Sequence, residues 1–489
     1  MTDPLQSTPA AAALAGLWQA AGLPAEALAW ADLPGCQPVL PSSFDVATAA
    51  QASLGAAALA AAEVWQRRSG RRQRVAVDRA HATLECSAHF AIDGQVPPLW
   101  DPLSGLYACG ADAGAPGWVR IHANFAHHRD RALAVLGLPP GPENTREAVT
   151  QALRGWTAER YEQAAADAGA VVAAARSFAQ WDAHPQAAAL AGQPPVVVER
   201  IPGSAGAKPR AWPALPAGAR PLHGLRVLDL TRILAGPVAG RCLAAYGADV
   251  MLVNGPHLPN IDAIADTSRG KLSAQVDLRD AAGRDTLLNL VDDAHVFLQG
   301  YRPGTLAARG FDAAALAARR PGIVVASLSA YGETGPWAGR RGFDSLVQTA
   351  TGFNLAEAEA AGKTAPQAMP MQILDYAAGH LLAFGIQAAL WRQAAQGGSW
   401  QVRVTLAGVG AWLRAMGRVP GGLDVARPAI DPWLEDSACG FGPGGAPATL
   451  RAVRHAPVFS ETPARWVRPS LPPGSHPPAW PPVAADAAA

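Results

Sequence analysis

The chain of 489 residues is long enough to fold into two or three domains with sizeable cores. Its 40 Lys and Arg residues balance 39 Asp and Glu residues, so no net field favours nucleic acid or an anionic membrane as a partner. A charged fraction of 16% with a hydrophobic fraction of 49% excludes a largely disordered chain. The 5 cysteines include no CxxC pair, which disfavours a zinc site or a disulfide framework and is typical of a cytoplasmic protein.

The N-terminal region, residues 1–201, contains one distinctive helix-to-strand pattern. Asp45 precedes an Ala-rich run that predicts a helix, and a turn at 67–70 leads to a short strand at 74–77. The opening residues lack the basic segment of a secretory signal, and the Ala-rich runs are too weakly apolar for a membrane span, so we expect buried helices. The histidines of the stretch 120–130 have no partner at metal-ligand spacing, so we expect no metal site.

Residues 202–224 are rich in Pro, Gly and Ala and have no apolar period, which predicts a linker. After it, apolar runs alternate with helical patterns; we expect strands at 225–230, 249–253, 295–299 and 322–329, with helices at 235–246, 280–292 and 304–318. This alternation predicts an α/β fold, with a doubly wound parallel sheet over 225–423 that binds ligand at the carboxyl ends of its strands. The absence of GxGxxG, and Asn254 in place of a ribose-binding acid, disfavour an NAD enzyme. Residues 424–489 are expected to be a closing segment with a Pro-rich tail.

The stretch 371-MQILDYAAGHLLAFGIQAALW-391 places one carboxylate, Asp375, at the start of a nearly uncharged helical run. From these residues alone, Asp375 is either a helix N-cap or a catalytic group. The pattern also repeats an earlier one. Asp45 is followed ten residues later by Gly55, just as Asp375 is followed by Gly385, and a V-x-V strand comes after each helix. Two copies of one supersecondary unit are therefore predicted.

Several motifs in chain order resemble class III CoA-transferases, the family of formyl-CoA and carnitine CoA-transferases. They are 221-PLHGLRVLDLTRILAGPVAGRCLAAYGADVMLV-253, 269-RGKLSAQVDL-278, 301-YRPG-304, 327-SLSAYGETGP-336, 342-GFDSLVQTATG-352 and 373-ILDYAAGHLLAFGIQAAL-390. The resemblance implies a Rossmann-like CoA-binding half and places the family's nucleophilic aspartate at Asp375. It shifts our interpretation of this residue from capping to catalysis.

The resemblance implies a reaction that moves CoA from an acyl-CoA to a carboxylic acid through a covalent aspartyl intermediate. No metal, redox group or other tightly bound cofactor is required, because the CoA thioester is itself a substrate. The expected CoA contacts are Lys271, Tyr301, Arg302, Ala235 and Gly236. The expected acyl-site residues are Ser329 and Tyr331. Two alternatives stay open: an acyl-CoA racemase or isomerase of the same family, and a catalytically idle CoA-binding protein.

The N-terminal region resembles the family's other portion, with the run 100–138 similar to its smaller α/β domain, which normally follows later in the chain. A rearranged or partly duplicated protein is therefore expected, either as a homodimer or as a single-chain pseudo-dimer. Some positions depart from the family pattern. Gln299 and Gly300 replace Glu-Asn before YRPG, and an arginine is displaced to Arg309. Phe343 stands where the related racemases carry an acid/base histidine, which argues against racemisation.

Overall fold

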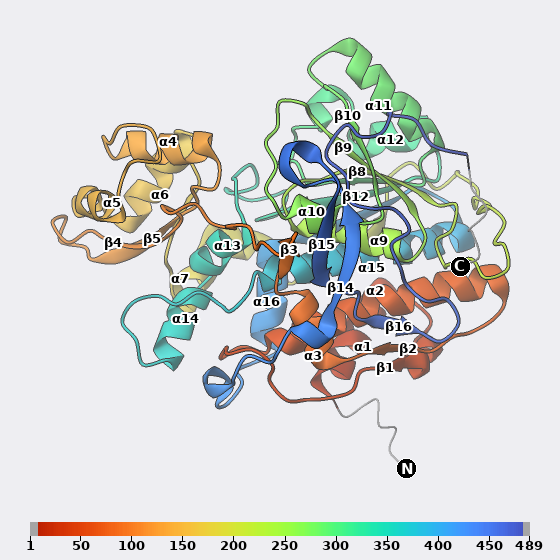
Figure 1. Ribbon diagram of the computed structural model, residues 1–489, viewed down its shortest axis with the longest axis horizontal. Coiled ribbons are helices and arrows are strands. Elements are labelled where there is room, and N and C mark those ends of the chain that lie inside the picture. The colour runs from red at the N-terminus through yellow and green to blue at the C-terminus, as the bar shows by residue number, and fades with distance from the viewer. Residues whose placement is uncertain (1–7, 483–489) are drawn as a thin grey trace.

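The computed structural model describes residues 8–482 and is built around one seven-stranded sheet (Figure 1). Its strands are β7 Val196–Arg200, β8 Arg226–Leu230, β9 Asp249–Asn254, β10 Leu272–Gln275, β11 Val296–Gln299, β12 Val324–Ser329 and β13 Trp400–Thr405. They lie in the order β10-β9-β8-β11-β12-β13-β7, and every pairing is parallel except that of β13 with β7. The expected parallel α/β sheet is present, and the residues 196–200 add an antiparallel edge strand that the sequence did not predict.

Both faces of these strands carry apolar side chains, so each face of the sheet has to be covered by another layer. Val227 and its neighbours on one face pack against α9 Ala235–Ala245 and α15 Ile373–Gln396. Leu228 and its neighbours on the other face pack against α11 Ala281–Asp293 and α12 Ala313–Arg319. The sheet is therefore the middle layer of three. The helix expected at 304–318 is in fact a 3-10 turn, Ala307–Arg309, followed by α12.

Helix α15 is itself covered by a long N-terminal helix, α2 Val46–Ser69, which lies beside it in Figure 1, and α1 Pro9–Ala21 packs on α2. Ala and Gly on α2 and α15 allow close approach, and both helices are almost fully buried. By length and composition α15 could cross a membrane, but 94% of its apolar window is buried inside the structure. This agrees with the expected buried helices.

A smaller α/β unit projects from one side of the molecule, in orange and yellow at the left of Figure 1. It contains the antiparallel strands β4 Gly105–Cys109, β5 Gly117–Ile121 and β6 Val172–Ala174, with α4 Ala126–Val135, α5 Arg146–Leu153 and α6 Ala158–Asp167. Its buried residues form an apolar cluster separate from that of the main sheet. The unit includes the segment expected to resemble the family's smaller domain.

The C-terminal segment is woven into the N-terminal one. Strands β14 Leu434–Cys439 and β15 Ala448–Val453 join β3 Phe90–Ile92, while β16 Pro457–Phe459 pairs with β2 Val75–Val77, which pairs with β1 Ala31–Asp32. The Pro-rich tail then follows the surface of the main sheet, where Trp480 Nε1 donates to the Leu290 carbonyl. Since β7, α1 and α2 also belong to the core around the sheet, the linker at 202–224 does not divide that core.

The remaining helices are short. They are α3 Arg79–Glu85, α7 Phe178–Asp182, α8 Pro185–Leu190, α10 Ile264–Thr267, α13 Asp344–Ala350, α14 Phe353–Ala360 and α16 Leu406–Ala415, with 3-10 turns at Ala25–Trp30, Gly422–Asp424, Asp431–Trp433 and Pro443–Gly445. Helices α13 and α16 contact each other and α15 near the start of that helix. They therefore help to fix the position of Asp375.

Candidate functional site

A cavity of about 450 Å³ opens where the sheet's parallel strands end. Its lining includes Leu230 at the end of β8, Gly300 just after β11 and Ser329 at the end of β12. Ligands of open parallel sheets bind at this edge, where the chain order of the strands reverses. In this sheet the reversal lies at β8, between β9 and β11. The cavity therefore lies where the sequence analysis expected a ligand.

Asp375 is the only carboxylate among the described residues that line this cavity. The lining also carries six arginines and three histidines: Arg232, Arg279, Arg302, Arg309, Arg340, Arg341, His127, His128 and His257. Such a surface attracts polyanions. A single carboxylate in a cation-rich cavity can act as a nucleophile toward an anionic substrate that the cations hold.

The first turn of α15 fixes the position of Asp375. The residue is not the N-cap, since Gln372 occupies that place and makes no side-chain capping bond. Instead, the backbone N–H of Asp375 donates to Oδ2 of Asp344 over 2.8 Å, and Gln348 Nε2 donates to the same carboxylate. Asp344, at the start of α13, thus caps α15 from outside the helix. This leaves the side chain of Asp375 free to face the cavity.

The two carboxyl groups shift each other's titration. Burial raises the pKa of Asp344 to about 7, although its hydrogen bonds oppose the shift. Burial, and then the charge of Asp344, raise the pKa of Asp375 well above its ordinary range. Asp344 has no exposed surface, whereas Asp375 is partly exposed. A raised pKa makes a carboxylate more basic and therefore a stronger nucleophile once it is ionised.

The start of α9 supplies backbone donors to the same cavity. Leu234 and Ala235 line it, and no side chain caps the helix, so its first N–H groups are available to an anion. Gly236 lies directly behind them: a Cβ there would stand 2.4 Å from Cβ of Thr231, so only glycine lets the helix approach the preceding loop this closely. Ile233, also in the lining, has a φ of 78°, a strained conformation of the kind found at functional sites.

Two of the lining arginines have no partner for their guanidinium groups among the described residues, namely Arg302 and Arg341. Burial, and then the charge of Arg302, lower the pKa of Arg341. Tyr301 lies beside Arg302 in the same lining. Arg302 and Tyr301 were expected there, but Arg341 was not. Its signal was the pair of arginines directly before the 342-GFD-344 motif.

Two expected contacts lie elsewhere. Lys271 is fully buried, where its Nζ lies 2.9 Å from Asp229 Oδ2 and donates to the Pro237 carbonyl. Its ammonium group is thus engaged and out of reach of a phosphate in this cavity. Tyr331 is buried beside Trp337, with ring centroids 4.9 Å apart, and does not line the cavity. Ser329, Ala235, Arg302, Tyr301 and Asp375 are brought together in one lining, with Gly236 behind it.

The smaller α/β unit forms part of the same cavity through residues that the sequence analysis left unassigned, Phe125, His127 and His128. The ring of His122, the residue directly after β5, stacks on Phe343 at 3.9 Å between centroids, which holds this unit against the 342-GFD-344 motif. Burial lowers the pKa of His128 to about 3, so its imidazole is neutral. Among residues 8–482, no three metal-ligating side chains come together.

Asp45, the counterpart of Asp375 in the predicted repeat, lies outside the cavity lining. It is the N-cap of α2, accepts from the Thr48 N–H and pairs with Arg79 over 2.6 Å. Asp45 is therefore a structural cap of α2. Asp375 is instead the third residue of its helix. The two aspartates therefore occupy different positions in their helices, although each is followed by a glycine ten residues later. Whether the two units superpose stays a prediction.

Residues 222–418 match the model of CoA-transferase family III, so this segment is similar to that family. The chain is 32% identical over 249 residues to a succinate–glutarate CoA-transferase of Agrobacterium fabrum, covering 45% of this chain and 62% of that protein. It is 31% identical over 309 residues to an acyl-CoA transferase of Gibberella moniliformis, covering 60% and 54%. A crystal structure of a hypothetical protein from Mycobacterium tuberculosis matches at 36% identity, with a TM-score of 0.37 and coverage of 40% and 58%. The chain thus spans little more than half the length of these relatives.

Proposed function

We propose that the chain is a CoA-transferase that moves CoA from an acyl-CoA donor to a carboxylic acid acceptor, with Asp375 as the nucleophile. The observation that carries this proposal is the position of Asp375 as the single carboxylate in a cavity whose described lining includes six arginines. CoA carries several phosphates, and unpaired guanidinium groups bind phosphates through paired, charge-assisted hydrogen bonds. The family of residues 222–418 supports the same reaction class.

The proposed reaction begins when an Oδ atom of ionised Asp375 attacks the thioester carbonyl carbon. The C–S bond breaks, CoA leaves as a thiolate, and an acyl-aspartyl anhydride remains. The thiolate then attacks the Cγ atom of Asp375 and releases the donor acid as a carboxylate, leaving an aspartyl-CoA thioester. An acceptor carboxylate reverses both steps and leaves with CoA. Each step exchanges one acyl bond for another, so no oxidant, reductant or metal is consumed.

The remaining residues of the cavity have supporting roles in this proposal. Arg302 and Arg341 bind phosphates of CoA, and the uncapped start of α9 adds backbone donors for the same anion. Asp344 positions the first turn of α15 through its bond to the Asp375 N–H. Ser329, which also lines the cavity, contacts the acyl group in this proposal. The Rossmann-like half thus holds CoA, while the smaller unit closes the cavity through Phe125 and His128.

An acyl-CoA isomerase is the second candidate, because one observation favours it. His128 is a neutral imidazole in the lining, and its buried Nδ1 has no partner among the described residues. Its place in the lining and its unpartnered Nδ1 would let it take the role of the histidine that Phe343 replaces, whereas its lowered pKa makes it a weak base, so the transferase stays the first candidate. Incubation in deuterated water separates the two candidates, because only an isomerase incorporates deuterium at the α-carbon.

The central test is mass spectrometry of the intact protein after incubation with a panel of acyl-CoA donors. A donor that the protein uses should leave a CoA adduct on the peptide that contains Asp375, and hydroxylamine should remove it. Asp375→Asn should abolish both the adduct and the exchange while CoA still binds, because an amide is a far poorer nucleophile. Asp45→Asn is the matched control and should form the adduct normally. Wild-type exchange by Asp375→Asn would refute the proposal.

The cellular setting and assembly follow as parts of the same proposal. The scattered cysteines, which include no CxxC pair, favour the cytoplasm. The smaller unit that lines the Asp375 cavity belongs to the same chain, which favours a single-chain pseudo-dimer over a homodimer. Light scattering at the concentration of the activity assay distinguishes these two forms.

A further inference from the structure

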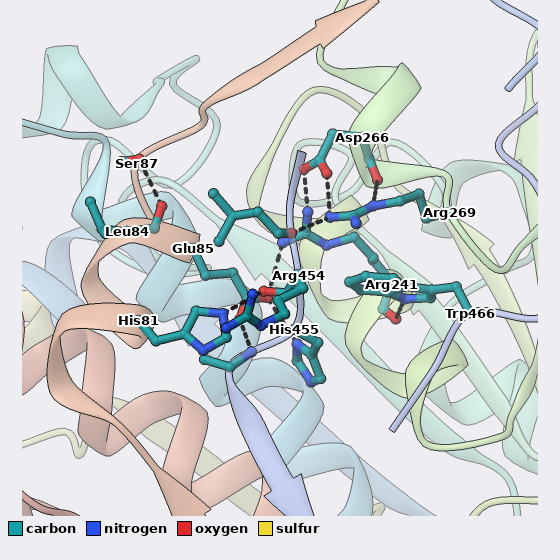
Figure 2. Close-up of polar contacts among 12 residues, drawn as sticks. His81, Leu84, Glu85, Ser87, Arg241, Asp266, Arg269, Arg454, His455 and Trp466 are labelled. Atoms are coloured by element: carbon teal, nitrogen blue, oxygen red, sulfur yellow. Dashed lines mark hydrogen bonds and ion pairs between the residues drawn. The ribbon is translucent and has the colours of Figure 1, made fainter. Parts of the chain in front are cut away.

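A second cavity, of about 400 Å³, lies beside the ionic cluster of Figure 2 and shares no lining residue with the first. Its walls are β14 and the segment 464–469, which is held in place where Trp466 Nε1 donates to the Arg241 carbonyl of α9. No part of the proposed reaction uses this cavity. Its existence therefore needs a separate account.

The floor of the cavity is rigid and polar. Figure 2 shows Arg269 beside Trp466, with the guanidinium 3.8 Å from a ring centroid, and paired with Asp266 over 2.6 Å. His455 lies next to them, its Nδ1 2.9 Å from Glu85. The His455 side chain is only 4% exposed, yet it belongs to the lining. Such a buried, fully connected network fixes the shape of a site in advance.

Two cations at the cavity have no carboxylate partner. Arg454 donates to the Pro432 carbonyl over 2.7 Å and lies over the Trp433 ring, but no described acid neutralises it. The Arg465 guanidinium has no hydrogen bond or ion pair to any residue in the described range 8–482. The two lining acids are already engaged by other arginines: Glu435 with Arg269, and Asp436 at 4.0 Å from Arg451.

We propose that this cavity binds a small organic anion bearing carboxylate or phosphate groups, held by Arg454 and Arg465. Guanidinium groups bind either oxyanion through paired N–H donors, and Trp466 and Val467 offer an apolar surface for the carbon skeleton. The cavity exceeds what a bare phosphate fills and falls in the size range of small-molecule sites. The proposal does not depend on the transferase assignment.

Isothermal titration calorimetry with citrate and with inorganic phosphate tests the proposal, at constant ionic strength set by potassium chloride. The titrations use the full chain and its Arg341→Ala variant, which weakens anion binding in the first cavity. Saturable binding of at least one probe should persist in Arg341→Ala and become about tenfold or more weaker in Arg454→Ala and in Arg465→Ala. The probe that binds more tightly identifies carboxylate or phosphate as the preferred group. Arg427→Ala is the control, because this exposed arginine lies outside the cavity lining.

Three results would overturn the proposal: no binding of either probe up to about 10 mM, undiminished binding by the Arg454→Ala/Arg465→Ala double variant, or loss of binding in Arg341→Ala alone. The Arg465 guanidinium makes no described contact, so Arg465→Ala is expected to fold. Circular dichroism checks this, and Arg465→Gln provides a second variant that retains the length of the side chain.

Discussion

Replacing Asp344 with Asn should move the pH dependence of the proposed reaction toward acid. The charge of Asp344 is one of the two causes that raise the pKa of Asp375, the other being burial. Asparagine keeps the size of the side chain and an oxygen that can accept the Asp375 N–H, but it removes the charge. Asp375 would then lose its proton at a lower pH. Because the ionised form is the nucleophile, the acidic limb of the kcat/KM profile should move to lower pH.

The size of this shift follows from the interaction of two neighbouring carboxylates. At the roughly 4–6 Å over which such pairs act, and with an effective dielectric constant of about 20, the repulsion is about 3 kcal/mol, or about two pKa units. Asp375 is partly exposed, so solvent screens part of the repulsion. We therefore expect the limb to move by about one pH unit.

Stability should respond to the same substitution with a definite sign. The pKa of Asp344 is raised from 3.8 to about 7 in the folded protein. Its contribution to stability is present below the unfolded pKa and is lost as the pH rises from 3.8 to about 7, because over this range the unfolded state has released a proton that the folded state still holds. The free energy of unfolding of Asp344→Asn, taken relative to that of the wild type, should therefore be lower at pH 4.5 than at pH 7.5, by roughly a few kcal/mol.

Formation of the acceptor's CoA thioester from the donor acyl-CoA, measured from pH 5 to 9, tests the shift of the acidic limb. Urea unfolding at pH 4.5 and 7.5 tests the effect on stability. Asp45→Asn is the control, since Asp45 lies outside the cavity lining and should leave the acidic limb in place. A limb that stays fixed or moves to higher pH in an active Asp344→Asn protein would refute the coupling between the two carboxyl groups.

Three further predictions concern charged residues. Arg302→Ala and Arg341→Ala should each raise KM for acyl-CoA by roughly tenfold to a hundredfold with little change in kcat, in line with the loss of a charged hydrogen bond; steady-state kinetics with an unchanged KM would contradict this. Lys271→Met should destabilise the fold by about 3–5 kcal/mol in urea, because it leaves Asp229 buried without its partner; wild-type stability with weaker CoA binding would favour the original phosphate role. Asp45→Asn should cost about 1–2 kcal/mol of stability through the α2 cap and leave turnover intact, whereas lost turnover in a stable variant would assign Asp45 a catalytic role.

The sequence predicted the main sheet well because its strands are short apolar runs with apolar faces on both sides. The strands expected at 225–230 and 322–329 appear as β8 and β12 with shifts of at most two residues. Strand β7 was not predicted because its pairing with β13 joins residues about two hundred positions apart. The propensity of Val196–Arg200 for a strand was visible, but its partner depends on the tertiary fold.

Site residues were predicted correctly where a sequence motif indicated both the residue and its position in the fold. They were predicted wrongly where the burial of a side chain determined what it contacts. Arg302 lies in the expected cavity because it follows the parallel strand β11, and Asp375 lies there because it belongs to the first turn of α15, which packs on the sheet. Lys271 does not, since Asp229 on the neighbouring β8 neutralises it in the interior. A local pattern cannot show that partner, which lies 42 residues away. Arg341 was missed because the pair of arginines before the 342-GFD-344 motif does not show which of the two lacks a partner, and only the fold shows that Arg340 donates to the Glu162 carbonyl.

The position of the smaller unit explains how a segment that precedes the main sheet in sequence contributes to the cavity at the carboxyl ends of its strands. Phe125, His127 and His128 reach the lining from a unit that precedes the sheet in sequence, and the stack of His122 on Phe343 fixes that unit beside Asp344. What a site of this kind requires is the spatial arrangement of the two parts, and chain order matters only through the connection between them. The segment 202–224, whose ends lie at β7 and β8 in the same sheet, provides that connection without crossing the cavity lining.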